Sequence, residues 1–168
     1  MDSDGRRLAR LPQTYRDYTV GLVRWQEIGQ LARLEKVVFP EPMSIMEVSH
    51  KVLSARSVFI AVRDSSRVVA YCAFEVFGRY AHIVDNVTHP SYQGQGLGQF
   101  VVTAVEPLAQ ARGAVGFLGE VRRSNTVQLH VVEKIGWQRV TLMPHFFGNG
   151  EDAYLVWKSF PMPGPGDP

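Results

Sequence analysis

The sequence predicts an α+β fold in which helices cover one mixed β-sheet. First, strand-like runs and helical patterns follow one another as strand, two helices, three strands, helix, strand, helix and two strands. Second, the chain has 168 residues, of which 45% are hydrophobic, so it has the size of one domain with a full core. Third, a glycine-rich turn joins the predicted central strand to a helix.

The first half of the chain alternates strand and helix signals. β-Branched and aromatic residues predict a strand over 18–24, and apolar residues at helical spacing predict a helix over 25–36 that ends before Phe39-Pro40. Ser44 and Glu47 have capping-box spacing, which predicts a second helix to about residue 56. Two strand patterns, 58–63 and 67–77, flank a polar three-residue turn and predict a hairpin.

The second half begins with the predicted central strand, 81–88. After the glycines, a helix is expected from about residue 98 to Arg112, closed by Gly113 and kinked at Pro107. Later segments predict a strand over 115–121, a helix from Ser124 or Asn125 to Gly136, and two strands over 137–142 and 153–159.

Composition bounds the organisation and the class of protein. We expect an N-terminal arm over 1–17, one domain over 18–160 and a disordered tail over 161–168. The formal charge is +2 with well-mixed signs, so no basic run indicates nucleic-acid binding. No stretch reaches the roughly 18 apolar residues of a membrane span, and the N-terminus lacks a signal-peptide core. These features predict a cytoplasmic protein, either a monomer or a homodimer.

Cysteine and histidine usage excludes two classes of site. Cys72 is the single cysteine, so an internal disulfide or a multi-thiolate metal site is impossible. The five histidines show no close pair at ligand spacing, and we expect no metal.

The stretch after the central strand carries the chemistry. Gly94, Gly96 and Gly98 alternate with Gln95 and Leu97, a pattern that allows successive N–H groups to point at an anion ahead of a helix N-terminus. The alternative is a plain turn. A Walker loop is excluded because no Lys-Ser/Thr pair follows, and the spacing differs from that of a dinucleotide fingerprint.

The remaining pattern, Gln93-x-x-Gly96-x-Gly98, resembles the pyrophosphate-binding signature of the GNAT family of acyl-CoA-dependent N-acetyltransferases. Segments 119–125 and 133–137 resemble that family's fifth strand and following helix. Phe39-Pro40, the segment 120–125 and Gly150-Glu151-Asp152-Ala153 make the chain most similar to bacterial ribosomal-protein-alanine N-acetyltransferases. The resemblance covers about residues 18 to 159.

The resemblance implies a fold and a reaction. The fold is a mostly antiparallel seven-stranded sheet flanked by four helices, with the fourth and fifth strands splayed. The reaction is direct attack of a primary amine, either a protein N-terminus or a small amine, on acetyl-CoA.

The resemblance also assigns residues. Glu120 matches the general base, and its alternative is a surface carboxylate paired with Arg122 or Arg123; Asp85 is the reserve base. The cofactor-binding positions are Asn86, Val87 and Thr88 for the pantetheine arm, Gly94, Gln95, Gly96, Leu97, Gly98 and Gln99 for the pyrophosphate, and Asn125.

One position departs from the family. Val132 stands where the N-terminal acetyltransferases have a tyrosine held to protonate the departing thiolate, and valine has no proton to give. His130 lies about 200° round the helix from that position. An alternative function is therefore a non-catalytic domain that binds or senses acyl-CoA. Glu41, Glu151 and Asp152 are either attractors of a cationic acceptor or ordinary surface charges.

Overall fold

Eight strands form one sheet in the computed structural model, which describes Leu11 and residues 13–161. From edge to edge they are β1 (Thr14–Tyr15), β2 (Tyr18–Leu22), β3 (Ser57–Asp64), β4 (Arg67–Phe77), β5 (Tyr80–Thr88), β6 (Gly116–Arg122), β8 (Ala153–Ser159) and β7 (Gln138–Met143). The helices are α1 (Ile28–Val38), α2 (Ile45–Val52), α3 (Leu97–Ala104), α4 (Glu106–Ala111) and α5 (Thr126–Lys134), with short 3-10 helices η1 (Trp25–Glu27) and η2 (Pro90–Tyr92).

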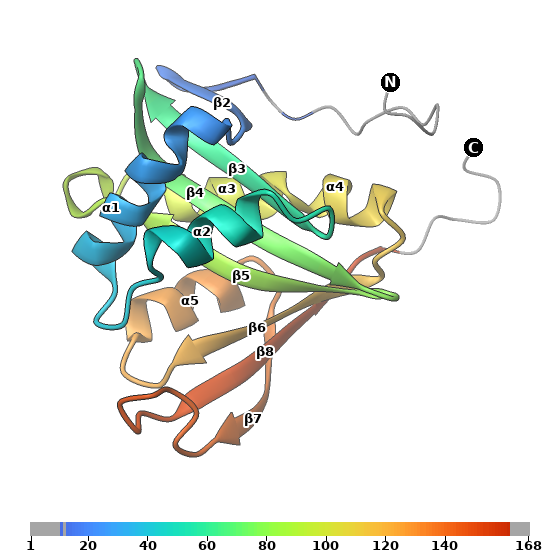
Figure 1. The fold of residues 1–168 in the computed structure, drawn as a ribbon. Helices are drawn as coiled ribbons and strands as arrows, with labels where there is room; N and C mark the ends of the chain where they lie inside the picture. The colour runs from blue at the N-terminus through green and yellow to red at the C-terminus, as the bar shows by residue number, and fades with distance from the viewer. Residues whose placement is uncertain (1–10, 12, 162–168) are drawn as a thin grey trace, which may run out of the picture.

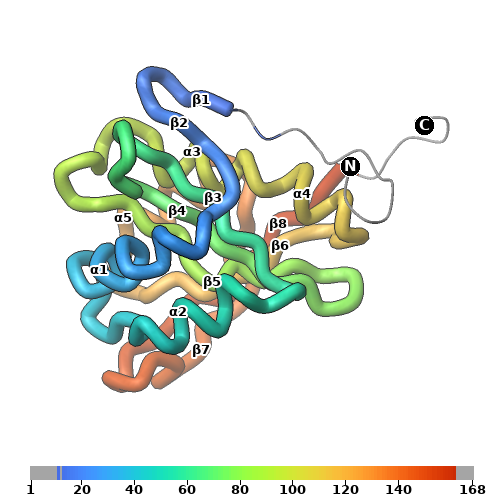
Figure 2. Tube along the Cα trace, turned by 45° about the horizontal axis from the view of Figure 1, so that its top comes forward, coloured from blue at the N-terminus to red at the C-terminus, as the bar shows by residue number. Residues whose placement is uncertain are grey.

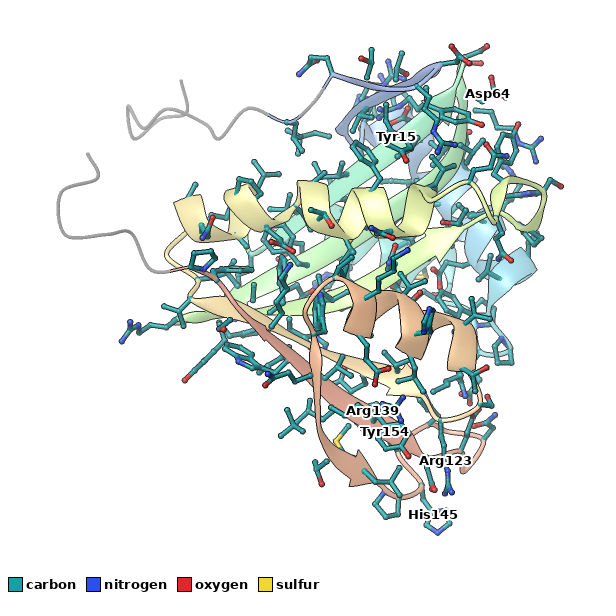
Figure 3. All side chains as sticks on the ribbon, turned by 180° about the vertical axis from the view of Figure 1, so that it is seen from behind. Tyr15, Asp64, Arg123, Arg139, His145 and Tyr154 are labelled. Carbon is teal, nitrogen blue, oxygen red and sulfur yellow. The ribbon has the colours of Figure 1, made fainter. Side chains whose placement is uncertain are left out.

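Helices cover both faces of this sheet. Figure 1 shows α1 and α2 in front of it, and Figure 3 shows α3, α4 and α5 on the other side. Each face has its own buried cluster: Leu31, Val48 and Tyr71 belong to the one under α1 and α2, and Phe117 and Leu129 to the other. The predicted α+β class, with one mixed and mostly antiparallel sheet, is confirmed.

The sheet has one strand more than predicted. β1 lies in the stretch predicted as an arm and pairs antiparallel with β2, through Thr14↔Thr19 and Tyr15↔Tyr18. Arg16 makes the tight turn with a positive φ of 52°, and the Val20 N–H donates to the Gln13 carbonyl at 2.9 Å. The rest of the predicted arm, apart from the residues around this hairpin, and nearly all of the predicted tail lie outside the described residues.

The helix predicted after the glycines is two helices. α3 ends at Ala104 and α4 begins at Glu106, so the kink expected at Pro107 is a break at Val105. Pro107 has no N–H for the carbonyl four residues earlier and its ring clashes there, whereas both requirements vanish in the first turn of a new helix. α4 then closes near Gly113, which has the predicted positive φ, 86°.

The two central strands β5 and β6 separate soon after they meet. They are parallel and pair only through Ala81↔Phe117 and His82↔Leu118, although β5 continues to Thr88. Figure 1 shows them diverging from their shared end like the arms of a V. The predicted splay is confirmed. The edge of β5 that faces β6 is left without a strand partner, among the described residues, beyond His82.

Two kinds of feature are absent from the described residues. No helix there has both the length and the apolar character needed to cross a bilayer. No group of three or more His, Cys, Asp or Glu side chains in that part of the chain is placed to hold a metal ion.

Candidate active site

The glycine-rich turn leads from β5 and η2 into α3. Gly94 and Gly96 have φ values of +75° and +79°, in the left-handed region that side chains disfavour, and Gly96 is the N-cap of α3. The backbone N–H groups of Gly94, Gln95 and Gly96 donate to no described residue, and the first N–H groups of α3 lack helical partners. The turn therefore presents a row of free donors at the positive end of a helix, as an anion site requires.

The β1–β2 hairpin contacts this turn, a contact that the sequence did not predict. The Tyr18 hydroxyl donates to Gln95 Oε1 at 2.7 Å, and the Tyr15 ring stacks on Phe100 of α3 at 4.0 Å between centroids. Both tyrosines come from the β1–β2 hairpin, which Figure 2 shows beside α3, and Figure 3 labels Tyr15 there. The hairpin thus fixes the shape of the turn from one side.

The end of β5 packs its alternate residues against the start of α3. Asn86 Nδ2 donates to the Gly98 carbonyl at 3.1 Å, and a Cβ built on Gly98 would lie 3.4 Å from Thr88 Oγ1. Val87 points to the opposite face, into the cluster under α1. Asn86 Oδ1 is buried and accepts no hydrogen bond from the described residues. A buried acceptor without a donor is costly in a bare protein, and a ligand N–H would satisfy it.

Glu120 of β6 lies where β5 and β6 part, and its partner is His82 of β5. The Nε2 atom of His82 lies 2.6 Å from Glu120 Oε2, and the two side chains are 37% and 21% exposed. The alternative pairing with Arg122 or Arg123 is wrong, because those arginines hold other carboxylates. Sequence reasoning missed His82, since the two partners are 38 positions apart.

Asp85, the reserve base, lies on the same face as His82 but under α1. Burial, and then the negative charge of Glu35, raise the pKa of Asp85 well above its ordinary value, with Lys51 opposing. Burial also raises the pKa of Glu35, whose carboxylate accepts a hydrogen bond from Tyr71. Glu120 stays the first candidate for the base, because it lies where β5 and β6 separate, whereas Asp85 lies under α1 beside the Glu35 carboxyl group.

Helix α5 begins at another predicted contact residue. Asn125 is its N-cap, and its Oδ1 accepts from the Gln128 N–H at 3.0 Å. Its side-chain oxygen is therefore engaged, and a cofactor would meet its amide NH₂ group. On the same helix Val132 is buried in the core, 3% exposed, and His130 is exposed. No hydroxyl replaces the family's tyrosine at position 132.

The three acidic residues considered for the acceptor are all engaged by arginines. Arg122 bridges Glu41, after α1, and Glu151, before β8, at 2.9 Å each. Asp152 binds Arg123 at 3.0 Å and accepts from the His145 N–H at 3.0 Å. Figure 3 labels Arg123 and His145 at the β7–β8 end of the sheet. These contacts tie the loop before β8 to the loop after α1.

The two parts of the site therefore lie on opposite faces of the sheet, close to where β5 and β6 separate. The glycine turn, Asn86 and Thr88 face α3, whereas His82, Glu120 and Arg122 face α1 and α2. A long, thin molecule anchored at the turn would lie along the edge of β5 that has no strand partner among the described residues. A second molecule approaching from the α1 and α2 side would meet its end beside Glu120. This arrangement suits transfer of a group from one substrate to the other.

Known proteins share this sequence pattern and fold. A model described as the acetyltransferase (GNAT) family matches residues 25–137. The N-alpha-acetyltransferase RimI of Mycobacterium tuberculosis is 28% identical over 145 residues, which cover 82% of this chain and 90% of that protein.

Two solved structures superpose on most of the chain. The ribosomal-protein-alanine N-acetyltransferase of Escherichia coli has a TM-score of 0.80 at 20% identity, covering 89% of this chain and 97% of the other. NAA60 of Arabidopsis thaliana in complex with acetyl-CoA has a TM-score of 0.79 at 13% identity, covering 84% and 98%. At such low identities these two structures show likeness of fold alone.

Proposed function

Because the chain belongs to the GNAT family of acetyltransferases, we propose that it uses acetyl-CoA to acetylate the α-amino group at a protein N-terminus. The observation that carries this proposal is the position of Glu120. Its carboxylate stands where β5 and β6 part, opposite the glycine turn and bound to His82 rather than neutralised by an arginine. The name of the Mycobacterium tuberculosis relative supports an N-terminal amine as the acceptor.

The residues of the glycine turn and of the end of β5 fit acetyl-CoA. The free N–H groups from Gly94 to Gly96 and the first turn of α3 would hold the pyrophosphate. The unpaired edge of β5 offers backbone donors to the amide groups of the pantetheine arm. Asn86 Oδ1, which has no donor among the described residues, offers them an acceptor. Acetyl-CoA supplies the activated acyl group as a thioester. The β5 backbone N–H groups would then stabilise the negative charge that develops on the carbonyl oxygen.

A non-catalytic acyl-CoA-binding domain is the second candidate, and Val132 is the observation that favours it. A missing general acid costs on the order of 10² to 10⁴ in rate. However, a thiol titrates near about 8.5, so a thiolate leaves tolerably at neutral pH without help. The proposal is therefore a slow enzyme rather than an inactive one.

Thiol release from acetyl-CoA tests the proposal. The protein is incubated with N-terminal peptides, with the same peptides blocked at their N-terminus, and with small primary amines. We expect CoA release only with free N-terminal amines, and mass spectrometry should locate the acetyl group on the N-terminal nitrogen. Binding of acetyl-CoA without thiol release for any amine would reject the enzyme and support the second candidate.

Replacing Gly96 by alanine should weaken CoA binding. The φ of +79° strains any side chain, and the new Cβ would lie 3.3 Å from Tyr15 Oη, so the turn must shift. Loss of one hydrogen bond to a charged group corresponds to about 1.5–3 kcal/mol, or roughly 10- to 150-fold in Kd. Calorimetric titration with CoA measures the change.

Gly113→Ala is the matched control for this variant. Gly113 has a similar φ of +86°, but it lies after α4 and has open space around its Cβ position. Its replacement should lower stability by a comparable amount and leave the Kd for CoA unchanged. If both variants bind CoA as the parent does, the glycine turn is not the pyrophosphate site.

A further inference from the structure

His82 contacts Glu120 in the geometry of a histidine–carboxylate pair. Leu118 of β6 pairs with His82 of β5, so Glu120, two residues further along β6, projects on the same face. The carboxylate holds Nε2 at 2.6 Å. The other ring nitrogen, Nδ1, makes no hydrogen bond to any described residue. A carboxylate bound to one imidazole nitrogen leaves the second one with a lone pair that can accept a proton.

The cross-strand neighbour of His82, Glu75, is engaged by other groups. Glu75 of β4 is its direct cross-strand partner, but Glu75 Oε1 is already bound by Lys51 at 3.1 Å and by the Ser57 hydroxyl at 3.2 Å. His82 is also 37% exposed, and an open groove of about 460 Å³ between α2 and the end of β4 includes Glu75 in its wall. Water can therefore reach this side of the dyad and take a proton from it.

Resting on the proposed function, we propose that His82 is a catalytic residue: its Nδ1 takes the proton from the acceptor ammonium, while Glu120 accepts a hydrogen bond from Nε2 and orients the ring. Glu120 then acts through the imidazole. Histidine is the side chain type that most readily exchanges protons near neutral pH, whereas a carboxylate alone is a weaker base.

The ammonium loses one proton to Nδ1 and becomes a neutral amine. Its nitrogen attacks the thioester carbon, so a C–N bond forms and the C–S bond breaks, and the electron pair leaves on sulfur. The second proton shed by the new amide nitrogen ends on the CoA thiolate, and His82 returns the first proton to water.

The test compares His82→Gln, His82→Ala and His130→Gln. Glutamine keeps a donor for Glu120 but cannot accept the proton, so a purely structural histidine would tolerate it better than alanine. We expect kcat to fall by at least about 10²-fold in both His82 variants, with KM for acetyl-CoA unchanged. Added imidazole should restore part of the rate of His82→Ala. His130 is exposed on α5, so His130→Gln should keep the parent rate.

The outcomes distinguish a wrong role for His82 from a wrong proposed function. A parent protein that transfers acetyl groups, together with a His82→Gln variant within about threefold of its kcat, would overturn the role of His82 and leave the function standing. A parent that transfers none would reject the function itself. NMR of the protein labelled with ¹⁵N in its histidine rings is a measurement that needs no turnover. The ring of His82 should carry its proton on Nε2, and a proton found on Nδ1 instead would also overturn the inference.

Discussion

Replacement of Glu120 by glutamine should lower kcat/KM for acetyl transfer by about 10²- to 10⁴-fold, the usual contribution of a positioned acid–base group. Glutamine has nearly the same shape, so the side chain still fits between β5 and β6. However, it has no carboxylate to accept the hydrogen bond from Nε2 of His82 and to orient the ring. Steady-state kinetics with an N-terminal peptide measures the loss, and KM for acetyl-CoA should stay near that of the parent.

The matched control for this variant is Glu133→Gln. Glu133 lies on α5, is 40% exposed and pairs with Arg139 on the surface. An exposed pair of this kind contributes about 0–1 kcal/mol, so the variant should keep both its stability and its rate. Equal kcat/KM for Glu120→Gln and the parent would remove Glu120 from the reaction, and with it the proposed pairing of acid–base roles with His82.

Local signals in the sequence were enough to predict much of this fold. Ser44 and Glu47 form the capping box that their spacing indicated, with the Ser44 N–H donating to Glu47 at 2.7 Å and the Glu47 N–H to Ser44 at 3.2 Å. The positive φ values of Gly94, Gly96 and Gly113 likewise follow from where those glycines stand. Each of these features depends on residues within a few positions of one another, so a single sequence displays it.

The features that sequence reasoning missed depend on contacts between distant segments. β1 has two residues and no pattern of its own, and it exists because β2 turns back alongside it. Pro107 indicated a disturbance in its helix, but local rules did not distinguish a kink from a break.

The residues of the candidate site also fall into those that the local sequence indicated and those that depend on contacts between distant segments. Glu120 could be singled out because neighbouring residues resemble a family motif, and its role as the base stays a prediction. His82 could not be singled out, since its position opposite Glu120 depends on the parallel register Ala81↔Phe117 and on where β5 and β6 separate. Tyr15 and Tyr18 were missed for the same reason, because the hairpin meets the glycine turn only after folding. A sequence can therefore indicate single residues of a site that is assembled between strands, but not which residues come to lie beside them.

Replacement of Glu27 by alanine should destabilise the fold by about 3–5 kcal/mol, the cost of leaving one partner of a buried ion pair alone. Arg63 of β3 donates to Glu27 through Nε at 2.6 Å and Nη2 at 2.7 Å, and the two side chains are 8% and 4% exposed. Arg63 Nη2 also donates to the Leu22 carbonyl at 2.8 Å. Glu27 thus joins η1 to β2 and β3. Urea denaturation at pH 7 measures the loss, and the Tm should fall by roughly 6–20 °C.

Arg24→Gln is the control for this variant. Arg24 also binds Glu27, but its side chain is 63% exposed, so its loss should cost less than about 1 kcal/mol. A Glu27→Ala variant that unfolds at the parent's urea concentration would show that the buried pair does not stabilise the fold. Replacing both partners by apolar residues of similar volume should recover stability, because no buried charge would then be left unpaired.

The stability that Glu27 provides should also disappear in acid. Burial alone would raise the pKa of Glu27, but hydrogen bonds from Arg63 and Arg24 outweigh it and lower the pKa from 4.5 to about 2. A carboxyl group whose pKa is lower in the folded protein stabilises the fold at pH values above the pKa that it has in the unfolded chain. This contribution is lost as pH falls from about 4.5 towards 2. The parent's free energy of unfolding should therefore fall more steeply over that range than that of Glu27→Gln, which has no proton to take up at this position. Parallel slopes for the two proteins would mean that Glu27 is not held ionised by its arginines.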